Sequence, residues 1–342
     1  MSGLVLCASI VDVDHHQTDS WHPERAARLS AVTAAIAHHD LSNVVAPFTA
    51  RQATMDDMAG AHDRNYLDAV RQFVEAGGGA LDPDTSTSAG SWETARWAAG
   101  AGLAAVDALA SCDAEAAFVG IRPPGHHATA NQAMGFCLVN NVAVLASHLA
   151  DRGERVAIVD WDVHHGNGTQ DIFWNDPRVL YASTHEHPAY PGSGAAAEVG
   201  GSEAMGTTVN VPLPPQSSGD AAIAAFDEII GPAIAAFDPG WLLVSAGFDA
   251  HRADPLANLE WTAGDYAVLT RRVLDLAPSS GRTIALLEGG YDLTALSASV
   301  TATIAALADV DDHRSEACSS GGLGRAAVAA AAESRRQALG GG

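Results

Sequence analysis

The sequence is poor in basic residues and in long apolar runs, and each shortage excludes a class of protein. Only 18 Lys and Arg residues stand against 41 Asp and Glu, for a formal net charge of −23. Phosphate backbones and anionic lipid surfaces require clustered basic side chains, so we expect neither a nucleic-acid partner nor a membrane-surface partner. No apolar run reaches the roughly 18–20 residues that a membrane-spanning helix needs.

Cysteine is also scarce, with Cys7, Cys112, Cys137 and Cys318 widely spaced. The absence of a CxxC pair excludes a zinc finger and a thioredoxin-like motif. Four cysteines in 342 residues are too few for a disulfide scaffold. Cys7 and Cys137 lie in apolar runs and are predicted to be buried thiols. The first residues lack the basic stretch of a signal peptide, so we expect a cytoplasmic protein.

Hydrophobic residues make up 47% of the chain, enough for an extensive core. Short, continuously apolar runs alternate with Ala- and Leu-rich stretches of helical spacing. The predicted strands are 3–9, 116–121, 155–160, 179–183, 241–246 and 283–288, and the predicted helices include 24–38, 92–109, 141–151, 219–236 and 265–276. This alternation predicts an α/β fold, with an open, mostly parallel sheet between two helical layers.

The remaining segments are predicted to be peripheral. Residues 185–206 and 211–219 are rich in Gly and Pro and are expected to form loops. The Ala- and Gly-rich segment from about 313 is expected to form a helix at the surface with a frayed end. We therefore treat residues 1–342 as a single domain.

Four predicted strands end in titratable residues beside glycine. The segments are RPPGHH at 122–127, DWDVHHGNG at 160–168, GFD at 247–249 and EGGY at 288–291. In an open parallel sheet, the carboxyl ends of the strands share one edge, where ligands bind. The sequence therefore predicts one site assembled from these four segments.

Asp162 and His164 are spaced to bind one metal ion. In extended chain, residues two apart point the same way. Asp249, from another strand end, would complete a set of three ligands with an open position, which is the form of a catalytic zinc site. Two carboxylates and one imidazole are also compatible with Fe²⁺, Co²⁺ or Mn²⁺.

The other strand ends offer groups for proton transfer. One imidazole of His126 and His127 can act as general base to water and then as acid to a leaving group. Asp160 and Asn167 are placed to orient the two rings, and the Asn partner suits the ring that must stay neutral. Tyr291 can donate a hydrogen bond to a substrate carbonyl and stabilise an oxyanion.

These segments resemble the zinc-dependent histone deacetylase superfamily, in its class II-like branch with the bacterial deacetylase-like amidohydrolases. The motifs are RPPGHHA, GFCLVNN, VDWDVHHGNGTQ, SAGFDAHRADPLAN and LEGGYD, and the resemblance begins at His22 and covers most of the chain. It implies the arginase-like three-layer fold and a zinc amidohydrolase that removes acetyl groups from acetyl-lysine side chains. Class II-like members carry Asn at the position of Asn167, where class I enzymes carry Asp.

The resemblance also implies roles for single residues. Asp162, His164 and Asp249 would bind zinc, His127 would be the base and acid, His126 would assist it paired with Asp160, and Tyr291 would polarise the carbonyl. Gly135, Phe136, Tyr190 and Leu256 would line the substrate tunnel, and Arg28 would face an internal acetate cavity. Structural potassium ions would contact Asp160, Asp162, His164 and Ser183 at an inner site and Phe173, Asp176 and Val179 at a second.

The substrate stays open at this stage between acetyl-lysine and an acetylated polyamine. Polyamine-selective relatives of the class II branch carry Glu after the Asp-Pro pair, where this chain has Leu256, which argues against that kind of selectivity. Bacterial polyamine enzymes instead use a dimer loop, so a homo-oligomer remains possible. A two-manganese ureohydrolase would need an acidic residue at Gly166, and a non-catalytic acyl-binding protein would lack a ligand or Tyr291; both are disfavoured.

Overall fold

A computed structural model describes residues 3–310 and 316–340. Its centre is an eight-stranded sheet in which every neighbouring pair of strands is parallel. In spatial order the strands are β2 (Val45–Pro47), β1 (Val5–Ser9), β5 (Ala116–Gly120), β10 (Thr283–Leu287), β9 (Trp241–Ala246), β6 (Val156–Asp160), β7 (Val179–Glu186) and β8 (Thr208–Leu213). The strands from β5 to β7 are buried throughout, as their unbroken apolar sequences predict.

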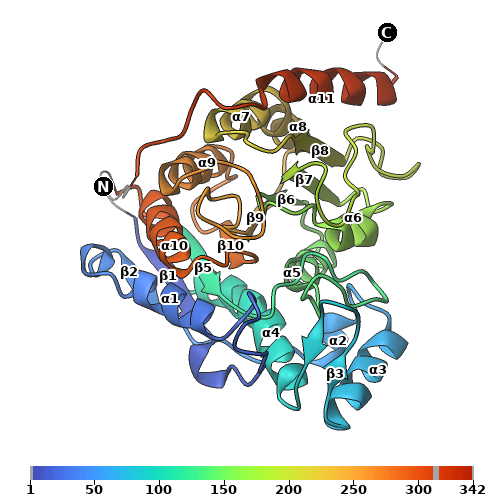
Figure 1. Ribbon diagram of the computed structural model, residues 1–342, viewed down its shortest axis with the longest axis vertical. Helices are drawn as coiled ribbons and strands as arrows, with labels where there is room; N and C mark the ends of the chain where they lie inside the picture. The colour runs from blue at the N-terminus through green and yellow to red at the C-terminus, as the bar shows by residue number, and fades with distance from the viewer. Residues whose placement is uncertain (1–2, 311–315, 341–342) are drawn as a thin grey trace.

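Helices cover both faces of this sheet (Figure 1). One layer holds α1 (Ala27–Ile36), α10 (Leu293–Leu307), α9 (Ala263–Asp275), α7 (Gly219–Ala225) and α8 (Gly231–Phe237). The other holds α4 (Ser91–Ala110), α5 (Asn141–Ala150) and α6 (Asn167–Phe173), with α2 (Met55–Met58) and α3 (Arg64–Glu75) beyond it. A small antiparallel pair, β3 (Gly79–Ala80) and β4 (Ser86–Thr87), lies beside α3. The predicted three-layer α/β fold is confirmed.

Two helix starts tie the helical layers to the edge of the sheet where the strands end. The side chain of Asn140 accepts a hydrogen bond from Ala143 N (3.0 Å) and so caps α5, while its amide donates to Ala128 O (3.1 Å). Asp292 caps α10 in the same way, through Ala295 N at 2.8 Å. These caps hold the segments that contain His127 and Tyr291 on rigid supports.

The structure corrects several predicted boundaries. The loop prediction for 211–219 is wrong at its start, because β8 runs to Leu213, and β7 continues into the predicted loop as far as Glu186. Pro212 is compatible with β8 because this strand lies at the edge of the sheet, where one side makes no ladder bonds. The predicted helix 219–236 is interrupted by a π-helical turn at Phe226–Ile230, and the predicted helix 24–38 begins only at Ala27.

The predicted surface helix near the C-terminus is confirmed as α11 (Arg325–Ala338). It lies against β8 and α7, where Arg335 donates hydrogen bonds to Gly206 O (2.7 Å) and Thr208 O. Covering an edge strand in this way protects it from pairing with another chain. Residues 313–315 and 341–342 of the predicted C-terminal segment, and with them its predicted frayed end, lie outside the described residues.

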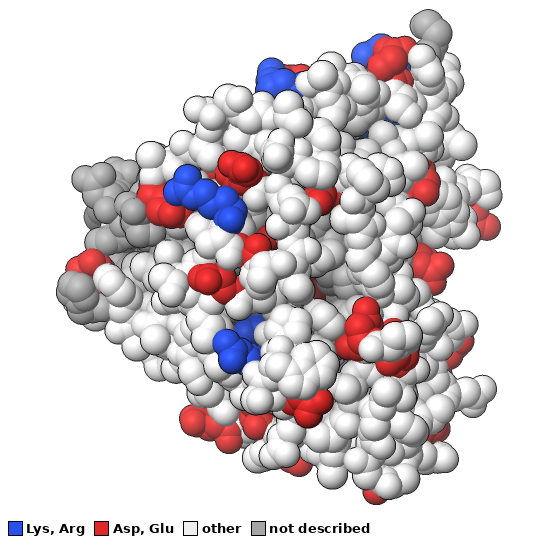
Figure 2. Space-filling model, in the orientation of Figure 1, with Lys and Arg blue, Asp and Glu red and all other residues white. Residues whose placement is uncertain are grey.

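Two further findings concern the surface. No helix in the described part of the chain combines the length and apolarity needed to cross a membrane. Cys7 and Cys137 are buried as predicted, and Cys112 and Cys318 are exposed. Figure 2 shows that carboxylates outnumber basic side chains on the face of the molecule that it presents.

Candidate active site

The four chemistry-bearing segments meet because their strands are neighbours. β5, β10, β9 and β6 are consecutive in the sheet, so the segments that follow them emerge side by side. Asp160, the last residue of β6, pairs in register with Ser245 of β9 on one side and Ser183 of β7 on the other. The predicted convergence at one edge is therefore present.

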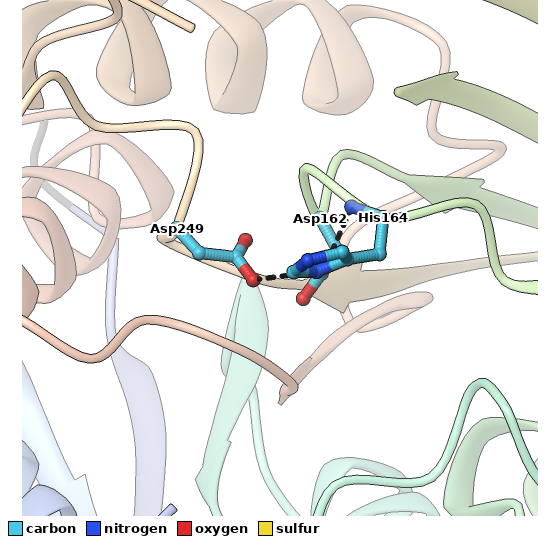
Figure 3. A group of neighbouring side chains, drawn as sticks. All are labelled: Asp162, His164 and Asp249. Carbon is cyan, nitrogen blue, oxygen red and sulfur yellow. Dashed lines mark hydrogen bonds and ion pairs between the residues drawn. The ribbon is translucent and has the colours of Figure 1, made fainter. Parts of the chain in front are cut away.

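Asp162, His164 and Asp249 form a compact group whose potential ligand atoms all lie within 4.8 Å of one another (Figure 3). His164 Nδ1 lies 3.1 Å from Asp162 Oδ1 and 3.1 Å from Asp249 Oδ2. Both carboxylates are buried, and burial together with the charge of Asp162 raises the pKa of Asp249. Two crowded, buried carboxylates beside an imidazole fit a divalent cation, since the ion would offset their charge.

The backbone around this group fixes the two carboxylates. Gly289 N donates to Asp162 Oδ2 at 2.7 Å, and Val163 N donates to Asp249 Oδ1 at 2.9 Å. A Cβ atom at position 289 would lie 2.1 Å from Asp249 Oδ2 and 2.5 Å from Asp162 Oδ2. Glycine is therefore required there, because only a residue without a side chain lets the backbone approach so closely.

The adjacent imidazoles of His126 and His127 have different partners. His126 Nδ1 lies 3.0 Å from Asp160 Oδ2, and His127 Nδ1 lies 2.8 Å from Asn167 Oδ1. The amide oxygen can only accept, so His127 carries its proton on Nδ1 and keeps a lone pair on Nε2. The ring centroids of the two imidazoles are 4.0 Å apart.

The pKa values of these two rings move in opposite directions. Burial alone would lower the pKa of His126, but the carboxylates of Asp162 and Asp160 outweigh it and raise the pKa to about 10. Burial, and then the positive charges of His126 and His164, hold the pKa of His127 well below its usual range. A divalent cation beside Asp162 would offset that carboxylate and lower the pKa of His126.

Glu288 is a functional residue that the sequence reasoning missed. Its buried carboxylate accepts hydrogen bonds from Gly125 N (2.6 Å) and His126 N (3.1 Å), which fixes the turn before His127. Burial raises the pKa of Glu288 to about 7. Its position at the end of a predicted strand, directly before Gly289, could have identified it from the sequence.

Tyr181 was also missed, because it lies within an apolar strand and shows no pattern of its own. Its hydroxyl donates to Asp160 Oδ2 at 3.1 Å and accepts from Gly166 N at 3.0 Å. It thereby holds the carboxylate that faces His126.

The position of Tyr291 is set by its backbone and by an arginine. Its N–H donates to the buried carboxylate of Asp254 at 2.6 Å, a contact that sequence reasoning also missed. The guanidinium carbon of Arg28 lies 4.9 Å from the centre of the Tyr291 ring, and Arg28 Nε donates to Gly290 O at 2.7 Å. None of the described residues makes a hydrogen bond to the Tyr291 hydroxyl, so this group is available to a ligand.

Comparisons with known proteins agree with this geometry. Residues 22–307 match the histone deacetylase domain. The chain belongs to the histone deacetylase family. It is 39% identical to a probable deacetylase of Archaeoglobus fulgidus (86% of this chain, 84% of the relative) and 38% identical to the histone deacetylase-like amidohydrolase of Pseudomonas aeruginosa (79% and 71%). The crystal structure of the HDA15 HD domain superposes with a TM-score of 0.88 at 35% identity, covering 98% of this chain and 95% of that one.

The residues that the family resemblance assigned to a tunnel lie near two of the catalytic candidates: Gly135 and Tyr190 are next to His127, and Phe136 is next to Tyr291. That these residues line a substrate tunnel stays a prediction. Phe136 has a positive φ of 68°, and its N–H donates to Thr85 Oγ1 at 3.0 Å. The ring of Tyr190 lies edge-on to His127, with centroids 5.0 Å apart, and is 39% exposed. Leu256 is 40% exposed, and its N–H donates to Asp254 Oδ1 at 3.0 Å.

The residues expected to hold potassium lie in two places. Ser183 lies next to Asp160 in the sheet, and its hydroxyl shares a hydrogen bond with His185 Nδ1 (2.9 Å). Phe173 and Val179 are buried, while the carboxylate of Asp176 is bonded to Arg178. These placements leave potassium binding in this deacetylase-family chain as a prediction.

Proposed function

We propose that this chain hydrolyses the acetyl amide of acetyl-lysine side chains, with a zinc ion held by Asp162, His164 and Asp249. One observation carries the proposal. The three potential ligands lie beside the imidazole of His127, whose pKa is low, and near the hydroxyl of Tyr291, which has no hydrogen bond to a described residue. These are the groups that amide hydrolysis needs at one point, namely a site for a Lewis acid, a base and an oxyanion donor. The zinc ion would act as a Lewis acid toward the acetyl carbonyl and the attacking water.

His127 moves the proton. With its proton on Nδ1 held by Asn167, Nε2 accepts the proton of the attacking water and then returns it to the leaving amine. The low pKa of His127 keeps this ring neutral near pH 7, as a base must be. The carboxylate of Asp160 favours the protonated form of the adjacent His126, which then stabilises the negative charge that develops on the acetyl group.

The Tyr291 hydroxyl donates a hydrogen bond to the developing oxyanion. Asp254 and Arg28 hold its backbone and its ring, so little reorganisation is needed when the substrate arrives. We also propose that Arg28 faces an internal cavity that takes up the acetate product. Its guanidinium already donates to Gly290 O, to Glu288 O and to Glu24 Oε1.

The proposed substrate follows from the proposed tunnel. Tyr190 beside His127 and Phe136 beside Tyr291 offer two aromatic walls, which suits the straight methylene chain of an acylated lysine. Structural potassium ions, at Asp160, Asp162, His164 and Ser183 and near Phe173, Asp176 and Val179, are part of the proposal. A cytoplasmic location and a possible homo-oligomer remain predictions.

The experiment compares acetate release from an acetyl-lysine peptide and from N-acetylputrescine, with the metal content of the same preparation. The sequence contains arginine but no lysine, so the enzyme adds no acetyl-lysine of its own to the assay. We expect about one zinc per chain and turnover of the peptide in preference to the diamine. Loss of both metal and turnover in His164→Ala, but not in the exposed control Asp107→Asn, would support the ligand assignment. Faster turnover of N-acetylputrescine would point to a polyamine amidohydrolase instead.

A further inference from the structure

A surface hollow of about 600 Å³ lies next to residues of the proposed tunnel. Met134 and Pro191 help to line it; Met134 directly precedes Gly135, and Pro191 directly follows Tyr190. Because Pro191 belongs to the lining, a peptide that passes over Tyr190 also passes beside this hollow.

The hollow is acidic and aromatic. Asp171 and Glu198 are the titratable groups among the described residues that line it, and no arginine is among them. Of the other surface hollows, one is lined by Arg152 and Arg282 and another by Arg155 and Arg335. A third has two carboxylates and no arginine, but no aromatic residue lines it. The chain has no lysine that could supply the missing positive charge.

The carboxylate of Glu198 is held in place from inside the protein. Gln170 Nε2 donates to Glu198 Oε2 at 2.7 Å. The carbonyl oxygen of Gln170 in turn accepts from Asn210 Nδ2 (2.7 Å) and from His165 Nε2 (3.1 Å). One carboxylate oxygen of Glu198 is thus fixed, and the other has no hydrogen-bond partner among the described residues.

Trp174 and Asp171 complete the hollow from α6. Trp174 follows the last residue of this helix, is half-buried and belongs to the lining of the hollow. Asp171 is exposed one turn earlier, and no described residue forms an ion pair with it. An indole flanked by two unneutralised carboxylates attracts a planar cation, which stacks on the ring while its N–H groups reach the acids.

We propose that this hollow binds the guanidinium of an arginine that flanks the acetyl-lysine in a peptide substrate. The inference rests on the proposed function, because it assigns a peptide-selectivity site beside the proposed tunnel. It identifies Asp171, Trp174 and Glu198 as the selectivity residues.

The test uses short peptides with one central acetyl-lysine and either arginine or citrulline at each flanking position in turn. Citrulline has nearly the shape of arginine and no charge, so the ratio of kcat/KM for the two peptides isolates the charge. At one flanking position we expect arginine to be preferred roughly three- to tenfold, as suits partly exposed charge pairs. In Asp171→Asn/Glu198→Gln that ratio should fall below about twofold.

The matched control is Glu75→Gln/Asp107→Asn, which removes two exposed carboxylates elsewhere and so changes net charge equally. This control should keep the arginine preference. If the control loses the arginine preference equally, the preference comes from long-range electrostatic steering and the proposal is wrong. The proposal is also wrong if arginine is preferred over citrulline at none of the flanking positions. Turnover of the citrulline peptides tests the proposed function separately, and its absence would contradict both.

Discussion

The Nδ1 atom of His127 lies 2.8 Å from Oδ1 of Asn167, so the proposed base is oriented by a neutral amide. The neighbouring His126 instead faces the carboxylate of Asp160 at 3.0 Å. Two adjacent imidazoles are therefore given opposite protonation states, one by a charged partner and one by a neutral partner combined with burial. The first prediction tests that difference.

Replacing Asn167 by Asp should move the acid limb of the pH profile to higher pH. A carboxylate at 2.8 Å stabilises the imidazolium, so the pKa of His127 rises, by about one unit or more. The base works only when neutral, so kcat/KM then begins to fall at a higher pH as the solution is acidified. The exposed control Asn43→Asp adds the same charge at a distance and should leave the limb in place. An unshifted limb in Asn167→Asp would argue against His127 as the base.

Removing the Tyr291 hydroxyl should lower kcat by about 10²–10³-fold, the usual effect of losing one oxyanion donor. The fold should persist, because that hydroxyl has no hydrogen bond to a described residue. Tyr266→Phe is the matched control, since the Tyr266 hydroxyl lies buried in the core and has no hydrogen-bond partner in the described part of the chain. Equal activities in the two variants, measured by acetate release, would contradict the role given to Tyr291.

Gly135→Ala should disturb the tunnel wall as well as the backbone. A Cβ there would lie 2.4 Å from His127 Cδ2 and 3.0 Å from Tyr190 Cε1, at a φ of +56°. Gly153→Ala measures the backbone effect alone, because Gly153 has a φ of +88° and a Cβ there would meet no described atom within 4 Å. We expect this substitution to lower the free energy of unfolding by about 1 kcal/mol. Overpacking should add about 1–3 kcal/mol in Gly135→Ala and reduce its turnover. Urea unfolding and acetate release measure both; equal stability of the two variants would exclude the close contact.

His62 should make the protein less stable below neutral pH. Its Nδ1–H donates to Thr129 O (2.9 Å), its Nε2 accepts from Asn140 N (2.9 Å), and burial lowers its pKa from 6.5 to about 4. Between these two values the unfolded chain binds a proton that the folded chain does not. This contribution to stability is therefore complete above about pH 6.5 and is lost as the pH falls toward 4, by up to about 3 kcal/mol.

Urea unfolding at pH 7.5 and pH 5 measures this contribution. His62→Gln should reduce the difference in unfolding free energy between the two pH values. His15→Gln, which changes an exposed imidazole, should keep the full difference. Equal pH dependence in His62→Gln and the unmodified protein would show that other groups cause the loss.

The sequence by itself determined the strands of the central sheet and the segments that carry the chemistry. A continuously apolar run identifies a buried parallel strand, and the residues that follow it must lie at the carboxyl edge of the sheet. The Asp162-x-His164 spacing is equally local, because residues two apart in extended chain point the same way. These features depend on neighbours along the chain and can be predicted without knowing how the strands pair.

Only the tertiary structure decided which segments meet and what holds them. The order β5-β10-β9-β6 places Glu288 under the amides of Gly125 and His126, 163 and 162 positions away in the sequence. The contact of Asp254 with the Tyr291 amide and the hollow at Glu198 likewise join segments far apart in the chain. Such contacts depend on strand order and on loop paths, for which hydrophobic periodicity carries no signal.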